Sequence, residues 1–322
     1  MDELDKKLLN ELQRSGYQKA SILALSLGVG ERTIRRRLNA FVSKGIIKAV
    51  AIPKPTLLGF HAWAHIGIVV KPGALRKVAR QLVDNPSIYF VAYCIGRFNF
   101  IVTVSFDTID HLIYFVNTEL TNMDGVRRTE TMLIAKHRKY YHFYWPETDL
   151  YDSRNTRQNY PEDDYELDAI DRSILDVLME DGLCHPVTIK TKLGMSESTI
   201  RKRINKMLKN DAFRIEVIPN LAILKERIWA DIGLVIENNS SAHKVIDSII
   251  SKQAVHGIAS VLGRYDIMMG GTFKDIDSLN SFVNNVLSEI EGVSSIDIYI
   301  LAGPLKYYRI NWYDSYHLAK DT

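Results

Sequence analysis

The 322-residue sequence has few of the features that mark several common classes of protein. Its two cysteines, Cys94 and Cys184, are too few for a disulfide framework and lack the spacing of a metal site. No apolar run approaches the roughly 18 residues of a membrane-spanning helix, and the charged N-terminus does not resemble a signal peptide. With 46% hydrophobic and 25% charged residues the chain has a globular composition, and we expect it in the cytoplasm with no membrane partner.

The chain also lacks a strong net charge. It has 41 Lys and Arg residues against 38 Asp and Glu, a formal charge of +3, so nucleic-acid binding would have to come from local clusters of basic residues. No nucleophile–base pair, phosphate-binding loop or pair of carboxylates stands at a catalytic spacing. We therefore assign no catalytic residue, metal or cofactor from the sequence.

What the sequence does contain is an internal duplication. A shift of 166 positions aligns the first fifty residues of the two halves without a gap, and after one extra residue a shift of 167 aligns most of the rest. Between the copies, residues 146–166 hold seven acidic and two basic residues without an apolar period, which predicts an exposed linker. The period is too long for a solenoid, so each copy should contain several elements. We predict two domains in each copy, at residues 1–53 and 54–145, and at residues 167–219 and 220–322.

The first fifty residues of each copy have the pattern of a winged helix-turn-helix. In copy one, leucines at helical spacing end at Gly16, a short helix ends at Gly28, and a third helix begins after Gly30. The β-like stretch 45–52 that follows is expected to form a wing. Copy two repeats the pattern, with Ser196 as a better N-cap for its third helix.

The third helix of each copy is basic on its outer face. Residues 31–44 and 196–209 each contain five basic residues and one acidic, a formal charge of +4. Such a face is often only a solvated surface, but its recurrence in the element that enters the major groove favours contact with double-stranded DNA. The predicted DNA-contact residues are Arg32, Thr33, Arg35, Arg36, Arg37, Asn39, Ser198, Thr199, Arg201, Lys202, Arg203 and Asn205.

The remainder of each copy predicts an α+β domain with the order β-α-β-β-α-β, a ferredoxin-like sandwich with both helices on one face. In copy one the strands are expected at 63–70, 88–95, 100–105 and 126–135, with helices at 74–85 and 108–120. The first of these strands carries apolar side chains on both faces, so the uncovered face needs a partner. Pairing of the two sheets would supply it.

Together these patterns resemble the leucine-responsive (feast–famine, Lrp/AsnC) transcription regulators. The resemblance rests on the opening run at Leu4 to Asn10 and Ile170 to Asp176, the Leu-Gly turn, the Thr-Ile-Arg-Arg-Arg-Leu helix and a Gly-x-aromatic-Asp/Asn loop between the second and third strands. It covers about 140 residues of each copy. It implies a winged helix that binds operator DNA and a sandwich domain that forms homo-oligomers and binds a small effector, commonly an amino acid.

The same resemblance places the effector near the glycine-containing loop. Glycine lets a backbone N–H approach a carboxylate, and the acid can meet an amino group. Copy one departs from the pattern because Asn99 replaces the acid, and both loops can also be read as plain tight turns. The candidate effector residues are Gly96, Arg97, Phe98, Asn99, Gly263, Arg264, Tyr265 and Asp266.

Weaker signals leave alternatives open. His61 and His65 would share a strand face, but their counterparts Arg227 and Asp231 do not repeat a metal-ligand pattern. The aromatic runs 139–145 and 306–313 would either stack on bases or, as we favour, pack on a neighbouring subunit. Our primary hypothesis is a sequence-specific transcriptional regulator. The alternatives are an enzyme that resembles the sirohaem decarboxylases, which share the architecture, and an amino-acid sensor without DNA contact.

Overall fold

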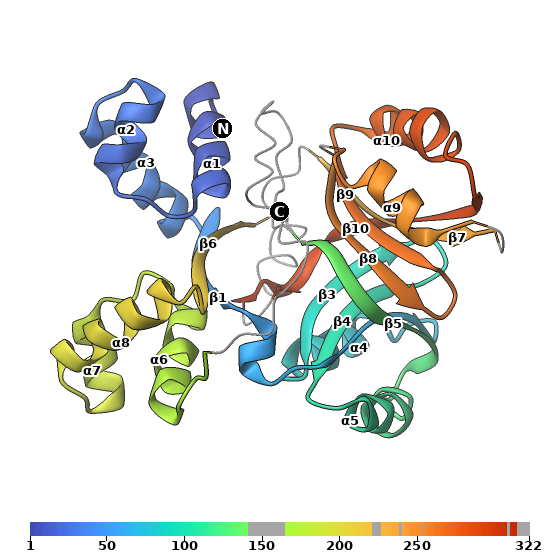
Figure 1. Cartoon of the computed structure of the whole chain (residues 1–322), viewed down its shortest axis with the longest axis horizontal. Coiled ribbons are helices and arrows are strands. Elements are labelled where there is room, and N and C mark those ends of the chain that lie inside the picture. The colour runs from blue at the N-terminus through green and yellow to red at the C-terminus, as the bar shows by residue number, and fades with distance from the viewer. Residues whose placement is uncertain (141–164, 221–226, 238–239, 253, 308–309, 314–322) are drawn as a thin grey trace. The chain divides into compact units, whose positions relative to one another are not determined.

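The computed structural model describes residues 1–140, 165–220, 227–237, 240–252, 254–307 and 310–313 (Figure 1). The described residues form two compact units, one of residues 1–58 and 165–220 and the other of residues 59–140 and 227–313. Each unit thus combines domains of one kind from both copies of the repeat. All of the predicted linker except its last two residues lies outside the described residues.

The first unit contains two sets of three helices at the places that the sequence predicts. Copy one has α1 (Glu3–Ser15), α2 (Ala20–Leu27) and α3 (Glu31–Ser43), and copy two has α6 (Ala169–Glu180), α7 (Pro186–Leu193) and α8 (Glu197–Lys209). The Ser196 side chain accepts a hydrogen bond from the Thr199 N–H, as predicted, whereas Gly30 supplies no side-chain cap. α2 and α7 each end at a left-handed glycine that stops the helix before the turn.

The predicted wing differs from expectation in its partner. β1 (Ile47–Pro53) pairs antiparallel with β6 (Phe213–Pro219) of the other copy, with Val50 opposite Glu216 at the centre. Each copy contributes one strand, so its backbone groups find their partners in the equivalent strand of the other copy. The short 3-10 helix η1 (Pro55–Leu58) follows β1. A two-stranded ribbon therefore joins the two helical domains.

The second unit repeats β-α-β-β-α-β, in the order that the sequence predicts. Copy one provides β2 (Ala62–Val70), α4 (Leu75–Asp84), β3 (Ile88–Ile95), β4 (Phe100–Phe106), α5 (Ile109–Tyr114), the π-helical η2 (Phe115–Leu120) and β5 (Val126–Tyr140). Copy two provides β7 (Ile228–Ile236), α9 (Ala242–Ile249), β8 (Val255–Leu262), β9 (Ile267–Phe273), α10 (Ile276–Phe282), η4 (Val283–Leu287), β10 (Val293–Tyr307) and the short β11 (Ile310–Asn311).

The strands of the two copies join into a closed ring. Within each copy the order is β3-β4-β2-β5 or β8-β9-β7-β10, and the pairs β5–β8 and β10–β3 connect the copies at both edges. The sequence predicts that the sheets pair, and the structure joins them edge to edge. Among the described strands no main sheet edge is left open, and the faces that the helices do not cover line the inside of the ring.

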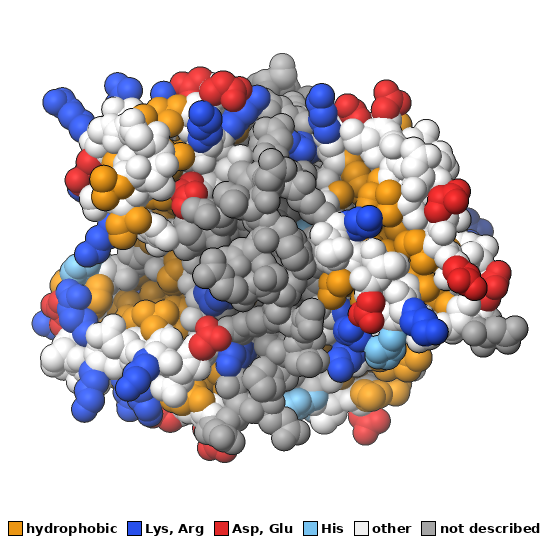
Figure 2. Space-filling model, turned by 45° about the horizontal axis from the view of Figure 1, so that its top comes forward, with side chains coloured by type: hydrophobic (Ala, Val, Ile, Leu, Met, Phe, Trp, Pro, Cys, Tyr) orange, Lys and Arg blue, Asp and Glu red, His pale blue; other side chains and the backbone are white. Residues whose placement is uncertain are grey.

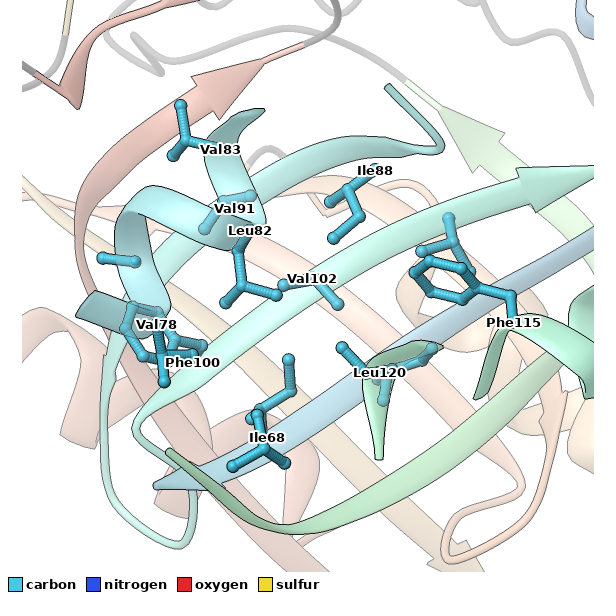
Figure 3. Close-up of a cluster of buried hydrophobic side chains, with 14 of the residues drawn as sticks. Ile68, Val78, Leu82, Val83, Ile88, Val91, Phe100, Val102, Phe115 and Leu120 are labelled. Carbon is cyan, nitrogen blue, oxygen red and sulfur yellow. The ribbon is translucent and has the colours of Figure 1, made fainter. Parts of the chain in front are cut away.

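The helix-covered face of each sheet carries the apolar core. In copy one, Ile68 and Val102 of the sheet pack with Val78 and Leu82 of α4 and with Phe115 of η2 (Figure 3). Copy two has an equivalent cluster around Ile232, Ile246 and Leu287. These cores follow from the alternation of apolar residues along each strand.

The C-terminal aromatic run packs within the chain. Tyr307 lies opposite Phe90 of copy one with ring centroids 6.1 Å apart, and the Tyr313 hydroxyl donates a hydrogen bond to the Arg76 carbonyl at 3.2 Å. The other copy of the repeat thus takes the place that we expected for a neighbouring subunit. Residues 141–145 of the first aromatic run lie outside the described residues. None of the described helices has the length and apolarity to cross a membrane.

Candidate functional site

The predicted DNA-contact residues form an exposed face on each third helix. On α3, Arg32, Arg35, Arg36 and Asn39 are exposed and Thr33 is half-buried. On α8 the exposed residues are Ser198, Thr199, Arg201, Lys202 and Asn205. Figure 2 shows Lys and Arg side chains projecting at the edge of the helical unit.

Two of these arginines are tethered along their own helices. Arg35 pairs with Glu31, and Arg201 donates to Glu197 Oε1 from Nε at 2.8 Å and from Nη2 at 2.6 Å. Exposed ion pairs at this spacing contribute only about 0.3–0.5 kcal/mol, so a phosphate can replace the carboxylate at little cost. Among the described residues, Arg36 of α3 has no ion pair, and neither does Lys202 of α8.

Arg37 and Arg203 have a different environment from the other predicted contacts. Arg37 Nη1 donates to Asp2 Oδ1 at 2.8 Å and also to Asp5, which anchors α3 to the start of α1. These hydrogen bonds raise the pKa of the Arg37 guanidinium above its ordinary value. Both arginines are half-buried, which the helix pattern alone did not reveal.

Arg203 repeats this anchor in copy two. Its Nη1 donates to Asp168 Oδ2 at 2.6 Å and to Asp171 Oδ1 at 2.8 Å. The sequence does contain a signal for this anchor, because the spacing is the same in both copies. Arg37 follows Asp2 by 35 residues, and Arg203 follows Asp168 by 35 residues. We therefore leave Arg37 and Arg203 out of the proposed DNA-contact set.

The two glycine-containing loops each lie against the other copy of the repeat. Gly96 and Gly263 have φ angles of 138° and 143°, which only glycine adopts readily. A Cβ atom on Gly96 would lie 3.3 Å from the Ile298 carbonyl, and one on Gly263 would lie 2.7 Å from the Thr131 carbonyl. The loops are thus close-packed at the seams where the two copies meet.

The acidic position of each loop has a structural hydrogen bond. Asn99 Oδ1 accepts the Val70 N–H at 2.9 Å, and Asp266 Oδ2 accepts the Ile236 N–H at 2.8 Å. Asn and Asp offer the same kind of oxygen acceptor here, which explains why copy one tolerates asparagine. The backbone hydrogen bond therefore explains why Asn99 can replace the acid, and no effector amino group is needed to explain it at either loop.

The aromatic position of each loop is buried. Phe98 stacks on Tyr299 with ring centroids 5.3 Å apart, and the Tyr265 hydroxyl donates to Asp297 Oδ2 at 2.6 Å. Phe98 and Tyr265 are only 2% and 3% exposed, so they are core residues of the seam.

The loop arginines converge on one carboxylate that sequence reasoning missed. Arg97 Nη2 lies 3.0 Å from Glu130 Oε1, and Arg264 Nε donates to Glu130 Oε2. Burial alone would raise the pKa of Glu130, but hydrogen bonds from Arg97 and Arg264 bring it below its ordinary value. No local motif marks Glu130, because its role depends on loops from both copies. Glu130 therefore links the two repeats of the ring-forming unit.

Histidines lie on the inner face of the ring. His65 Nδ1 is 3.0 Å from Thr103 Oγ1, while His61 is exposed before β2. Burial lowers the pKa of His65 to about 4, with His137 adding a smaller effect, and burial also lowers the pKa of His137 to about 4. Both rings are therefore neutral at pH 7. Within the described part of the chain, no three His, Cys, Asp or Glu side chains gather as metal ligands.

Comparison with known families agrees with this arrangement. A model of the Lrp/AsnC ligand-binding domain matches residues 64–142 and again residues 231–310. A winged helix-turn-helix DNA-binding model matches residues 1–48, and an AsnC-type helix-turn-helix model matches residues 167–208. The chain belongs to the Lrp/AsnC family of transcriptional regulators.

Single-repeat relatives show the same relationship. One HTH-type transcriptional regulator of Pyrococcus furiosus is 30% identical over 141 residues, which span 44% of this chain and 95% of the relative. Another from that organism, FL11, is 31% identical over 137 residues, which span 42% of this chain and 90% of the relative. One copy of the repeat thus corresponds to nearly the whole length of each of these relatives.

A solved structure shares the fold of the whole chain. The sirohaem decarboxylase NirDL matches 99% of this chain and 100% of its own, with a TM-score of 0.59 and 15% identity. At that identity the likeness shows the fold alone.

Proposed function

We propose that this transcriptional regulator acts as a regulator dimer contained in one chain. Each copy would be a winged helix-turn-helix joined to a ferredoxin-like sandwich, and α3 and α8 would enter major grooves of double-stranded DNA about 34–36 Å apart, or a multiple of that. The observation that carries the proposal is the pair of exposed basic faces at equivalent positions of the two copies. The β1–β6 ribbon supports it, because it couples the two helical domains.

The two recognition faces differ, so the proposed half-sites differ too. The α3 set is Arg32, Thr33, Arg35, Arg36 and Asn39. The α8 set is Ser198, Thr199, Arg201, Lys202 and Asn205. Arginine is suited to guanine and to phosphate, whereas serine and threonine hydroxyls discriminate less between bases. We therefore expect the half-site under α3 to be the more strongly specified one.

Selection of binding sites from random duplex DNA tests the proposal. The full chain should enrich a sequence of two unequal half-sites with centres about one or two helical turns apart. Arg36→Ala should lower the affinity for DNA and reduce the slope of log K against log salt concentration by about one unit, the contribution of one phosphate contact. Lys202→Ala should do the same. Lys77→Ala, on α4 of the other unit, is the matched control and should leave the slope unchanged. Failure to enrich any sequence would refute the sequence-specific function.

An effector response and assembly of several chains complete the proposal. The family resemblance implies a small effector, in many members an amino acid, and homo-oligomers formed through the ring-forming domains. The two glycine loops, at the seams between copies, remain the proposed place of coupling because they join the copies through Glu130. Mobility shifts with the selected DNA, with and without each of the common amino acids, test the response. If none changes the DNA affinity, the amino-acid effector is wrong.

One observation favours a second candidate function. The whole-chain likeness extends to NirDL solved in co-complex with an iron-uroporphyrin III analogue, with a TM-score of 0.60 and 15% identity. The alternative is therefore a sirohaem decarboxylase without DNA binding. Incubation of the purified protein with sirohaem under anaerobic conditions tests it, with product followed by absorbance and mass spectrometry. Loss of carboxyl groups at catalytic protein concentrations would establish the enzyme, and unchanged sirohaem would exclude it.

A further inference from the structure

The second helix of each ring-forming repeat has a different outer face in the two copies. At a shift of 167 residues, Ile113 and Tyr114 of α5 correspond to Asn280 and Ser281 of α10. In copy two these residues are exposed, and the Ser281 hydroxyl accepts a hydrogen bond from the Asn285 side chain at 3.0 Å. The same place in the fold is therefore polar and hydrated in copy two but hydrophobic in copy one.

The outer face of α5 carries three large hydrophobic side chains, which we call the α5 patch. Ile109, Ile113 and Tyr114 are 53%, 50% and 61% exposed and lie within two turns of one helix. The inner side of the same segment is already packed, because Leu112 and Phe115 belong to the core of copy one. Single exposed hydrophobic residues are common on protein surfaces, but a group of them is typical of an interaction surface.

The polar residues beside the α5 patch suit a contact between two identical helices. Asp110 and Asn117 are exposed, and neither side chain has a hydrogen bond within the described part of the chain. If two α5 helices lie antiparallel and are centred between Ile113 and Tyr114, Asp110 of each chain lies opposite Asn117 of the other. The amide N–H can then donate to the carboxylate. The remaining charged side chain of the helix, His111, pairs with Asp107 of its own chain.

The size of the α5 patch limits the strength of such a contact. Two isoleucines and a tyrosine that are each about half exposed offer on the order of 300 Å² of mostly apolar surface. Together with the polar residues around them, two facing patches would bury on the order of 1,000 Å² in total, the low end for specific interfaces. We therefore expect a reversible dimer of chains that dissociates in the micromolar range.

We propose that the α5 patch binds the α5 patch of a second copy of this chain, and that assembly stops at two chains. A contact of this kind uses the same surface on both partners and leaves none free for a third chain. Copy two cannot extend the assembly, because Asn280 and Ser281 interrupt the equivalent surface. The inference rests on the proposed assembly of several chains and names its surface and its limit.

Sedimentation equilibrium of the full chain between about 1 and 200 µM tests the contact. The average mass should rise with concentration from 36.8 kDa toward twice that value and no further. Ile113→Asn combined with Tyr114→Ser should raise the dissociation constant at least tenfold. These are the residues that copy two has at the same places, so the helix should be preserved, which circular dichroism checks. Ile276→Asn is the matched control, because Ile276 is the equivalent of Ile109 and is 50% exposed, and it should leave the constant within twofold.

Transfer of the patch to copy two gives a test that does not depend on loss of binding. Asn280→Ile combined with Ser281→Tyr should produce assemblies of more than two chains that grow with concentration, because each chain then presents two such patches. Assembly of this variant that still ends at two chains would overturn the proposal.

The other outcomes separate this surface from the proposed function. Assembly of the wild type beyond two chains, or assembly unchanged by the substitutions at Ile113 and Tyr114, would overturn the α5 contact and leave oligomerisation itself standing. A wild type that stays monomeric up to about 200 µM would overturn the contact and leave the patch to a different partner. DNA binding by the same proteins is measured separately on the selected sequence, and its absence would count against the regulator function alone.

Discussion

Replacement of Arg203 by methionine separates a structural arginine from the DNA-contact arginines. Methionine keeps much of the apolar stem and removes the guanidinium that bridges Asp168 and Asp171. The Asp171 side chain is 2% exposed, and its other described hydrogen bond, from the Tyr165 hydroxyl, is long at 3.4 Å. The substitution therefore leaves a buried carboxylate without its cation.

The size of the effect follows from burial. Breaking a buried ion pair from one side costs about 3–5 kcal/mol. Because the Arg203 side chain is itself 25% exposed, we expect the lower end, about 3 kcal/mol. For a domain of this size that corresponds to a fall of about 10 °C in melting temperature.

Arg37→Met in copy one is the matched control. Its partner Asp5 has a side chain that is 19% exposed, and among the described residues the buried Nε of Arg37 has no acceptor. Loss of this more hydrated bridge should cost only about 1 kcal/mol, or about 3 °C.

Circular dichroism of the full chain at pH 7 measures both melting temperatures. Below its melting point, Arg203→Met should bind the selected DNA with an affinity within about threefold of wild type. Equal destabilisation by the two substitutions would refute the burial argument. A normal melting temperature combined with weak DNA binding would place Arg203 on the DNA instead.

Three further predictions concern the ring-forming unit. Gly263→Ala should destabilise it by more than about 2 kcal/mol, because Gly263 has a φ of 143° and a Cβ atom there would also lie 2.7 Å from the nearest atom. Gly28→Ala should cost only about 1 kcal/mol, because Gly28 has a φ of 66° and its Cβ atom would meet no atom within 4 Å. Thermal melts of the two variants measure the difference. Glu130 has a lowered pKa in the fold, so its contribution to the free energy of unfolding is present above its unfolded pKa and is lost as the pH falls through its folded pKa. Glu130→Gln should therefore flatten the loss of stability at acid pH. An unchanged loss of stability would contradict the role of Glu130 in linking the two repeats. His65 and His137 have pKa values near 4 in the fold, so as the pH falls the unfolded chain takes up protons at these histidines before the folded chain does. Stability should therefore fall as the pH is lowered from about 6.5 to about 4. NMR titration should show both rings neutral at pH 6.

The sequence alone reveals the elements that local periodicity and repetition encode. Helical spacing of leucines, the glycine stops and the serine cap place the six helices of the first unit where the structure has them. The order β-α-β-β-α-β and the buried alternation of residues such as Ile66 and Ile68 are read in the same way. Each of these signals lies within a few residues, so one copy suffices to show it and the second copy repeats it.

Tertiary structure decides which copy each element joins. β1 pairs with β6 rather than within its own wing, and the β5–β8 and β10–β3 pairs close the ring, because unpaired backbone groups find partners in equivalent strands far along the chain. Such pairings leave no local mark, so the sequence showed that the sheets need a partner but not which edges meet.

The roles of individual polar residues depend on those same long-range pairings. Arg203 and Arg201 lie two residues apart on one helix, yet one anchors α6 and the other faces outward. Asp231 and Glu130 look alike as acids on strands, yet Glu130 pairs with three arginines, Arg97, Arg128 and Arg264, and Asp231 has no charged partner among the described residues. The sequence determines the kinds of domain and their order, since these depend on local patterns. Only the folded chain determines which charges meet, because that depends on contacts between the two copies.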